Sequence, residues 1–337
     1  MKLKLKAFLV LISVAVLVLM CTTVFAADKL VVGFAQIGSE SDWRVGSTNS
    51  VRQACADAGF ELIFVDANQM QENQLSALRD FITRGVDYIG FSPVVMTGWD
   101  QIMREIKDAG IPVIMLDRNI DMPNHTDYYA TWIGSNFIEE GEKSAIWLLD
   151  YLKHVGREGE EINIVELQGT VGSSPAIDRK TGFENIIKDH ANLKISQSQT
   201  GDFTTELGKT VMESFLRKAQ SDGVKIDVLY AHNDGMAIGA IQAIKEAGLV
   251  PGKDIIIIGV DAVKLAFEAI LAGDMNVTVE CSPLLGPQFV QAIKDIEAGK
   301  TLEKITFSIE HVYDETLSKV FPDKYLSAEE HYPSRVY

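Results

Sequence analysis

Along the chain, short uninterrupted runs of apolar residues alternate with longer stretches in which apolar positions recur at helical spacing. The runs are dominated by Val, Ile, Leu and Phe, which is typical of strands buried on both faces of a parallel sheet. They cover residues 30–37, 61–66, 86–92 and 112–117 in the first half of the chain, and 162–167, 193–198, 227–231 and 254–260 in the second. The pattern predicts a repeated order of strand and helix.

Glycine ends most of the predicted helices, because it adopts the left-handed backbone that terminates a helix at little cost. Right-handed crossovers turn each run of strands and helices into a doubly wound sheet, and the two runs join around residues 130–136. We therefore expect an α/β fold with two doubly wound parallel-sheet lobes, and a ligand site beyond the carboxyl ends of the strands. The glycines that mark helix ends are Gly59, Gly85, Gly110, Gly248 and Gly273.

The N-terminus carries the features of an export signal. Three lysines within the first six residues precede an apolar run over residues 7–20, which is shorter than the roughly 20 residues of a stable membrane span. Val24-Phe25-Ala26 fits a signal peptidase site, so we predict a signal peptide over residues 1–26 and export to the periplasm or the cell surface. A lipid anchor at Cys21 is the minor alternative, since a bulky Met20 precedes this cysteine.

The charge balance excludes one class of partner. The chain has 47 acidic and 31 basic residues, and loss of Lys2, Lys4 and Lys6 with the signal moves its formal charge from −16 to −19. Such a surface repels phosphates, so we expect no nucleic-acid partner. Cys55 and Cys281 remain in the mature chain. We expect both to be small buried residues that do not form a disulfide. No histidine lies in a cluster with metal-ligand spacing, so we expect neither a metal nor a cofactor.

Polar and aromatic side chains gather directly after the predicted strands. Carboxylates, carboxamides and guanidinium groups each present two donors or acceptors spaced to engage neighbouring hydroxyls, and the flat face of a tryptophan suits the C–H side of a sugar ring. Together these residues predict a site for a neutral polyol. The first half of the chain contributes Ser39, Glu40, Trp43, Arg44, Asp117 and Arg118, and the second half contributes Thr170, Arg179, Asn233, Asp261 and Glu280.

Two kinds of enzyme compete with this interpretation. Asp117, Asp261 and Glu280 are candidates for the carboxylates of a glycosidase, but arginines in the same crevice would keep them ionised, which disfavours a general acid. The stretch Gly169-Thr170-Val171-Gly172-Ser173 follows a strand, but it lacks the third glycine of a dinucleotide site and the lysine of a phosphate-binding loop. We therefore expect a protein that is not an enzyme.

Four segments together resemble the periplasmic sugar-binding proteins of ABC importers, of the ribose-binding type: VGFAQIGSES at 32–41, the Asp117-Arg118 pair, ELQGTVG at 166–172 and YAHND at 230–234. Within that family the chain is most similar to the galactofuranose binders, and the similarity covers essentially the whole mature chain. In place of glycines of the family, this sequence has Asp42 and, after Asp261, Ala262.

The resemblance implies a type I periplasmic-binding-protein fold with a three-segment hinge near residues 134–136, 281–282 and 308–310. The N-terminal lobe would comprise residues 27–134 plus about 282–309, and the C-terminal lobe about 135–281 plus 310–337. It also implies that the eleven candidate residues are ligand contacts.

The function implied by the resemblance is capture of a monosaccharide, galactofuranose or a related furanose or pyranose, by hinge closure. A monomer would then deliver the sugar to an ABC transporter permease in the membrane. A chemoreceptor-coupled protein or an autoinducer-type furanose sensor remains the alternative, because both use the same scaffold. A repressor effector domain fits poorly, because this chain has an export signal where a DNA-binding segment would stand. We expect the tail over residues 324–337 to lie on the surface or to fray, and assign it no function.

Overall fold

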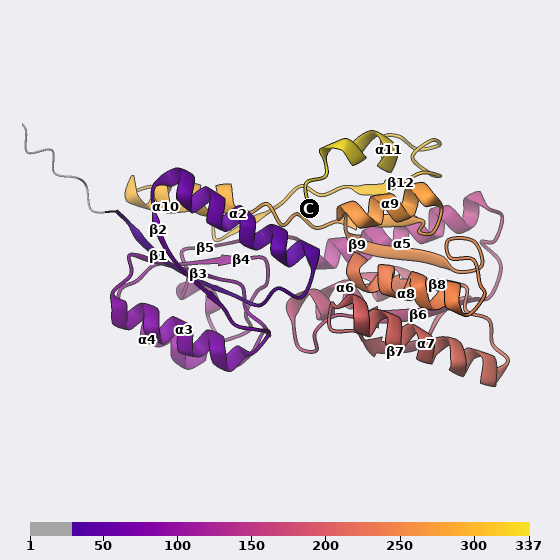
Figure 1. The fold of residues 1–337 in the computed structure, drawn as a ribbon, viewed down its shortest axis with the longest axis horizontal. Coiled ribbons are helices and arrows are strands. Elements are labelled where there is room, and N and C mark those ends of the chain that lie inside the picture. The colour runs from indigo at the N-terminus through magenta and orange to yellow at the C-terminus, as the bar shows by residue number, and fades with distance from the viewer. Residues whose placement is uncertain (1–28) are drawn as a thin grey trace, which may run out of the picture.

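A computed structural model describes residues 29–337, which form two lobes side by side (Figure 1). The predicted signal peptide, including Cys21, lies outside the described residues. Each lobe contains one sheet covered by helices, which confirms the predicted α/β fold with two mainly parallel sheets. Among the described helices, none combines the length and apolar character needed to cross a membrane.

The sheet of the N-terminal lobe has six strands in the order β11-β5-β4-β3-β1-β2, and every neighbouring pair is parallel. Four of these strands coincide with predicted apolar runs, whereas β5 and β11 are short and were not predicted as strands. The strands are β1 (Val31–Gln36), β2 (Glu61–Asp66), β3 (Tyr88–Phe91), β4 (Val113–Leu116), β5 (Thr131–Gly134) and β11 (Ile305–Phe307).

The sheet of the C-terminal lobe has seven strands in the order β13-β12-β10-β9-β8-β6-β7. All neighbouring pairs are parallel except β10 and β12, which run antiparallel because the chain returns to this lobe from the opposite direction at its end. The strands are β6 (Ile162–Gln168), β7 (Leu193–Thr200), β8 (Val228–Ala231), β9 (Ile256–Asp261), β10 (Val277–Glu280), β12 (Val312–Asp314) and β13 (Leu326–Ser327).

Helices cover both faces of the N-terminal sheet and enclose a separate apolar core on each. Leu78 and Trp99 belong to one core, and Cys55 and Phe289 belong to the other. The C-terminal lobe has a single large core, which includes Cys281 at its edge. Both cysteines are buried and unpaired, as expected. The helices are α2 (Asp42–Ala58), α3 (Gln71–Arg84), α4 (Asp100–Asp108), α5 (Phe137–His154), α6 (Ser174–Ile187), α7 (Thr205–Asp222), α8 (Asp234–Glu246), α9 (Lys264–Ala272), α10 (Gly286–Glu297) and α11 (Ala328–His331), with short 3-10 turns at His125–Asp127 and Tyr332–Ser334.

Helix ends follow the local signals in the sequence. Gly59, Gly85 and Gly273 stand at the C-caps of α2, α3 and α9 with φ between 63° and 77°, and this left-handed backbone favours glycine. At the other end of α2, the Ser41 hydroxyl accepts the Arg44 backbone N–H at 3.2 Å. This cap orients the first turn of α2, which carries several candidate site residues.

The chain passes between the two sheets three times. It leaves the N-terminal lobe between β5 and α5, returns between β10 and α10, and leaves again between β11 and β12. As a result α10, which follows the C-terminal strand β10, packs beside α2 on the N-terminal sheet, and Figure 1 shows it there. Residues 135–136, 281–285 and 308–311 are called the three crossings below.

Candidate functional site

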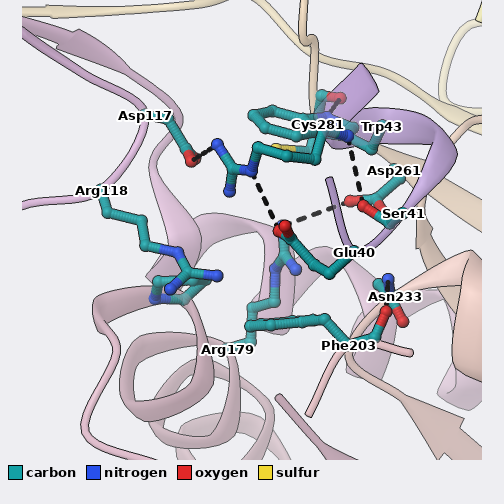
Figure 2. Close-up of a pocket in the computed structure, with 12 residues that line it drawn as sticks. Glu40, Ser41, Trp43, Asp117, Arg118, Arg179, Phe203, Asn233, Asp261 and Cys281 are labelled. Carbon is teal, nitrogen blue, oxygen red and sulfur yellow. Dashed lines mark hydrogen bonds and ion pairs between the residues drawn. The ribbon is translucent and has the colours of Figure 1, made fainter. Parts of the chain in front are cut away.

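A narrow cleft between the lobes collects polar and aromatic side chains from both (Figure 2). Its enclosed space is about 20 Å³, room for one or two water molecules, so the lobes stand close together in this arrangement. A small ligand here would touch both lobes at once. The N-terminal lobe contributes Glu40, Ser41, Trp43, Arg44, Asp117 and Arg118, the C-terminal lobe contributes Pro175, Arg179, Phe203, Asn233 and Asp261, and the second crossing contributes Cys281.

Arg44 organises the N-terminal side of the cleft. Its Nε donates to Glu40 Oε1 at 3.0 Å, and its Nη1 pairs with Asp117 Oδ2 at 2.9 Å. Burial alone would lower the pKa of Arg44, but the charges of Asp117 and Glu40 outweigh it and raise this pKa. The other oxygen of Glu40, Oε2, has no hydrogen-bond partner among residues 29–337. The side therefore offers an acceptor that a ligand hydroxyl can satisfy.

Arg118 presents an unused donor. Its Nη1 donates to the Val94 carbonyl at 2.7 Å, while its buried Nε finds no partner within the described chain. Burial, with a contribution from nearby Arg44, lowers the pKa of Arg118 to about 10. The guanidinium lies 5.2 Å from the centre of the Phe203 ring, on the other lobe. In Figure 2 Arg118 extends into the cleft, where a hydroxyl oxygen would accept from its free N–H.

Arg179 organises the C-terminal side. Its Nε donates to Glu140 Oε2 at 2.6 Å, its Nη1 donates to the His232 carbonyl at 2.5 Å, and its Nη2 lies 3.7 Å from Asp261 Oδ1. Burial works against the charge of Arg179, but Glu140 raises its pKa well above the usual value. These contacts hold the guanidinium rigidly at the cleft wall.

Asp261 lies beside Arg179 at the end of β9 and is buried at the cleft wall. Burial raises its pKa well above that of an ordinary aspartate, and the neighbouring carboxylate of Asp234 adds to the effect. Asp234 itself lies deeper, where it accepts from Thr278 Oγ1 at 2.8 Å. The expectation that arginines keep Asp261 ionised is therefore wrong in direction, because burial outweighs the long contact with Arg179 and favours the protonated form, which can donate to a ligand hydroxyl as well as accept from one.

Two aromatic rings line the cleft from opposite lobes. Trp43, on α2, donates its Nε1–H to the Cys281 carbonyl at 2.6 Å, so its ring is fixed against the second crossing. Phe203 follows β7 and packs over Gly169, where a side chain of any size would collide with the ring. The rings offer flat apolar surfaces between the charged groups, as binding of a sugar requires.

Several residues at the carboxyl ends of strands adopt left-handed backbone. Asp117, Phe203 and Ala262 have φ of 64°, 62° and 58°, and Asp261 has φ of 124°. Such conformations cost about 1–3 kcal/mol each and occur mainly at functional sites. The left-handed backbone of Ala262 is one that glycine would adopt without strain.

Eight of the eleven predicted residues line the cleft: Glu40, Trp43, Arg44, Asp117, Arg118, Arg179, Asn233 and Asp261. Asn233 acts first as the N-cap of α8, since its Oδ1 accepts the Met236 N–H at 3.0 Å and its Nδ2 donates to the Phe203 carbonyl at 3.1 Å. One amide N–H therefore remains for a ligand.

Three predicted residues lie elsewhere. Ser39 is exposed beside a surface hollow that it shares with Arg52, and the Thr170 carbonyl accepts from the Ser173 hydroxyl in the turn before α6. Glu280 is bound by Arg335 at 2.8 Å and by His311 and Tyr313 on the far side of β10. None of the three is among the residues that line the cleft.

Four cleft residues were not predicted. Phe203 lies in Gly201-Asp202-Phe203-Thr204, directly after β7, so an aromatic residue beyond a strand end was an available signal. Ser41 is the helix cap between two predicted residues. In the sequence, Pro175 looks like an ordinary residue at the start of a helix, and Cys281 looks like an ordinary core residue. They line the site only because the two lobes come together there.

Two similar lobes, three crossings and a closed polar cleft lined by aromatic rings define a two-lobed solute-binding protein. The chain belongs to the periplasmic binding protein family, since the family model described as "Periplasmic binding protein domain" matches residues 32–301. This is a family of extracytoplasmic binding proteins rather than enzymes, as the sequence predicted.

Among known proteins, the galactofuranose-binding protein YtfQ of Escherichia coli K12 is 47% identical over 288 residues, which cover 85% of this chain and 88% of that protein. A Mycobacterium smegmatis structure in complex with β-D-fucofuranose is 45% identical, with a TM-score of 0.82 over 90% of this chain and 97% of the other. The binding protein of the arabinose ABC transporter of Shewanella sp. ANA-3, bound to α- and β-L-arabinofuranose, is 43% identical, with a TM-score of 0.82 over 91% and 95%.

Proposed function

We propose that this chain is the sugar-capturing component of an ABC importer and that its ligand is a monosaccharide in the furanose form, with galactofuranose the first candidate. The observation that carries this proposal is the cleft itself, which two aromatic rings line and where Arg118 and Glu40 each keep a buried polar atom without a partner in the described chain. The names of the similar proteins, which bind galactofuranose, fucofuranose and arabinofuranose, support the furanose form.

Capture would proceed by hinge closure. In the open form the cleft residues of each lobe face water, and a sugar that bridges both lobes favours the closed form by the difference in its affinity for the two. Arg118 and Asp117 from one lobe and Arg179 and Asp261 from the other are the bridging groups. Trp43 lines the cleft, with the Arg44 guanidinium 4.6 Å from its ring centre and its N–H held by the second crossing, and it would stack on the sugar with the face that Arg44 leaves open.

Closure of this kind needs two bodies joined by a hinge. We propose the division expected from the family, with residues 27–134 plus about 282–309 in one lobe and about 135–281 plus 310–337 in the other. The three crossings of the chain between the sheets support this division.

The closed form would act as a monomer that docks on a membrane permease and releases its sugar there. The proposal includes export under the direction of the signal peptide over residues 1–26, with a lipid anchor at Cys21 as the minor alternative. Cell fractionation with and without palmitate labelling distinguishes a free protein from an anchored one.

Calorimetric titration of the mature protein tests the ligand. The panel is D-galactofuranose, D-galactose, L-arabinose, D-ribose and D-glucose, with a parallel thermal-shift measurement, since a ligand that binds only folded protein raises its Tm. We expect galactofuranose to bind most tightly, and Glu40→Gln to weaken it because the free carboxylate oxygen is lost. Asp42→Asn is the matched control, since Asp42 lies two residues away and is exposed.

A pyranose or pentose that binds as tightly would overturn galactofuranose as the ligand while leaving the family assignment intact. No binding to any sugar would overturn the import proposal and favour a furanose-type signal as ligand.

A further inference from the structure

The three crossings meet at one buried carboxyl. Glu310 lies in the third crossing, and its Oε1 accepts the hydroxyl of Ser135 from the first crossing. The same oxygen accepts the backbone N–H of Ser282, in the second crossing, at 3.1 Å. A single side chain therefore joins all three segments that any movement of the lobes must bend.

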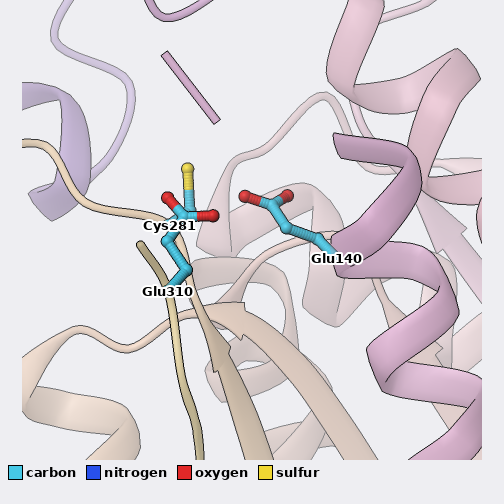
Figure 3. Close-up of side chains that lie close together, drawn as sticks. All are labelled: Glu140, Cys281 and Glu310. Carbon is cyan, nitrogen blue, oxygen red and sulfur yellow. The ribbon is translucent and has the colours of Figure 1, made fainter. Parts of the chain in front are cut away.

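Glu140 and Cys281 complete the cluster, which Figure 3 shows as side chains directed toward one another. Glu140 comes from α5 and is buried, with one oxygen bound to Arg179 and the other, Oε1, without a partner in the described chain. The Cys281 thiol lies 3.4 Å from the Ser135 hydroxyl.

The charges around the cluster do not balance if both carboxyls are ionised. Arg179 is the cation bound to Glu140, whereas Lys143 donates to the backbone carbonyl of Glu310 at 2.9 Å and pairs with Glu139 instead of with either buried carboxyl. His311 is turned outward to Glu280. Burial makes the thiolate of Cys281 unfavourable, so the thiol stays neutral.

Burial, together with the negative charge of Glu140, raises the pKa of Glu310 to about 9. This direction agrees with the geometry, because a protonated Glu310 has a hydrogen to donate and Glu140 has an oxygen without a donor.

We propose that Glu310 and Glu140 share one proton when the lobes are closed, and that this pair, whose remaining negative charge is balanced by Arg179, stabilises the closed form. The hydroxyl of Glu310 donates to Glu140 Oε1, while Glu140 Oε2 holds Arg179 at the cleft wall. Glu140 is thus a positioning residue for a cleft arginine, and the hinge is coupled to the sugar site through two side chains. The effect on sugar binding rests on the proposed import function, whereas the shared proton itself does not.

The proposal has a definite sign with pH. When the lobes open, bending of the crossings admits water to Glu310 and lowers its pKa part of the way toward the value of about 4.3 that it has in the unfolded chain. Between the pKa of the open form and about 9 the closed form binds one more proton than the open form, so closure weakens as pH rises through this interval. The folded state loses stability over the same interval, because the unfolded chain also carries an ionised glutamate there.

The substitution Glu310→Gln removes the titratable carboxyl and keeps the shape of the side chain. Its amide can still accept from Ser135 and donate to Glu140. Without sugar, the parent should lose stability as pH rises and the variant should not. We therefore expect the Tm of the variant minus that of the parent to increase by several degrees from pH 6 to pH 9. In protein labelled with ¹³C-glutamate, which separates glutamate from buried Asp234 and Asp261, the infrared band of a protonated glutamate carboxyl should be present in the parent at pH 7 and absent from the variant. Glu303→Gln, at an exposed carboxylate in the turn before β11, is the control and should follow the parent.

Titration with galactofuranose then measures closure. The affinity of the parent should fall at least about tenfold between pH 6.5 and pH 9. Over the same interval, the affinity of Glu310→Gln should fall by a factor at least about ten times smaller. Buried Asp234 and Asp261, whose pKa values are also raised, titrate in both proteins, so the difference between the two curves isolates Glu310.

A constant Tm difference across the pH range, or a tenfold loss of affinity in Glu310→Gln at pH 6.5, would overturn the proposal. If the variant does not fold, the infrared band of the protonated glutamate in the parent is the test. Its presence at pH 7 and its loss by pH 10 would support the shared proton, and its absence at pH 7 would overturn it. A rise in Tm with ZnCl₂ that Cys281→Ser abolishes would also overturn it, since the three side chains would then hold a metal. If no sugar binds while the band and the Tm curves behave as expected, the shared proton stands and the import function fails.

Discussion

At the scale of single residues, the cleft is notable for polar atoms that the protein itself leaves without partners. Arg118 Nε and Glu40 Oε2 are both buried, and a buried unpaired polar group costs about 1–3 kcal/mol. A ligand that supplies an acceptor and a donor in the closed cleft removes that cost, so it favours the closed form over the open form, in which water satisfies both groups. Specificity follows for the same reason, because an analogue without the hydroxyl leaves the groups unpaired.

Arg118→Met tests this argument, since methionine keeps the length of the side chain and loses the guanidinium. Affinity for the sugar should fall roughly 10- to 100-fold, the range expected for a hydrogen bond to a charged group. The Tm without sugar should change little, because loss of the bond to Val94 is offset by removal of a buried unpaired N–H. Calorimetry and thermal unfolding measure the two effects separately.

The control is Arg104→Met, at an exposed arginine on α4, which should change neither quantity. Parental affinity in Arg118→Met would show that this guanidinium does not contact the ligand.

At the scale of elements, the C-terminal tail is part of the fold rather than frayed. Strand β13 pairs with β12, and Arg335 reaches back to stack on Phe267 and Tyr313 at 4.8 and 4.5 Å while bonding Glu280. Tyr337 follows, with its carbonyl accepting from the Lys264 N–H at the start of α9. In Figure 1 the C-terminus lies between the lobes. Because Arg335 in the tail binds Glu280, this carboxylate is not available to a ligand in the cleft.

Arg335→Met should therefore lower the Tm. The substitution removes a charged hydrogen bond and two cation–aromatic contacts, so about 1.5–3 kcal/mol is expected, which corresponds to a fall of roughly 3–9 °C for a protein of this size. Sugar affinity should be nearly unchanged, since Arg335 does not line the cleft. Differential scanning fluorimetry gives the first result and calorimetry the second.

Arg217→Met is a suitable comparison, because Arg217 is exposed and its ion pair with Glu213 is long, at 3.6 Å. An equal Tm shift in both variants would mean that the tail adds no stability of its own.

At the scale of the whole molecule, the proposed function depends on closure of the two lobes around the sugar. The lobes contact each other at the cleft through Arg118 and Phe203, and at the three crossings through the cluster around Glu310. A sugar shifts the balance between open and closed forms only by its differential affinity for them. Each bridging group therefore contributes to the fraction of closed protein as well as to the affinity.

Small-angle X-ray scattering should show this directly. The radius of gyration of the sugar-free mature protein should exceed that of the arrangement described above, and saturating galactofuranose should reduce it. Arg118→Met at the same sugar concentration should remain extended, because its cleft is not filled. If a sugar that binds by calorimetry leaves the scattering curve unchanged, ligand binding is not coupled to closure.

Local patterns in the sequence determined most of the fold. Apolar runs, helix caps and terminal glycines act within a few residues, so the central strands and the α/β order could be predicted. Strands β5, β11 and β13 could not, because no apolar run marks them, whereas the equally short β3, β4 and β8 each lie within one. The same logic gave eight of the cleft residues, since the ends of parallel strands gather at one edge of a sheet.

The choice of partner for each side chain was decided only by the tertiary structure. Glu280 looks like any other carboxylate after a strand, yet Arg335, 55 residues later, binds it first. Ser135 and Glu310 are 175 residues apart and carry no motif, but the three crossings bring them into contact. The sequence alone determined which groups stand at strand ends, because that depends on local periodicity. Long-range packing decides which of these groups line the cleft and which are bound by other residues of the protein. No local sequence pattern carries that information.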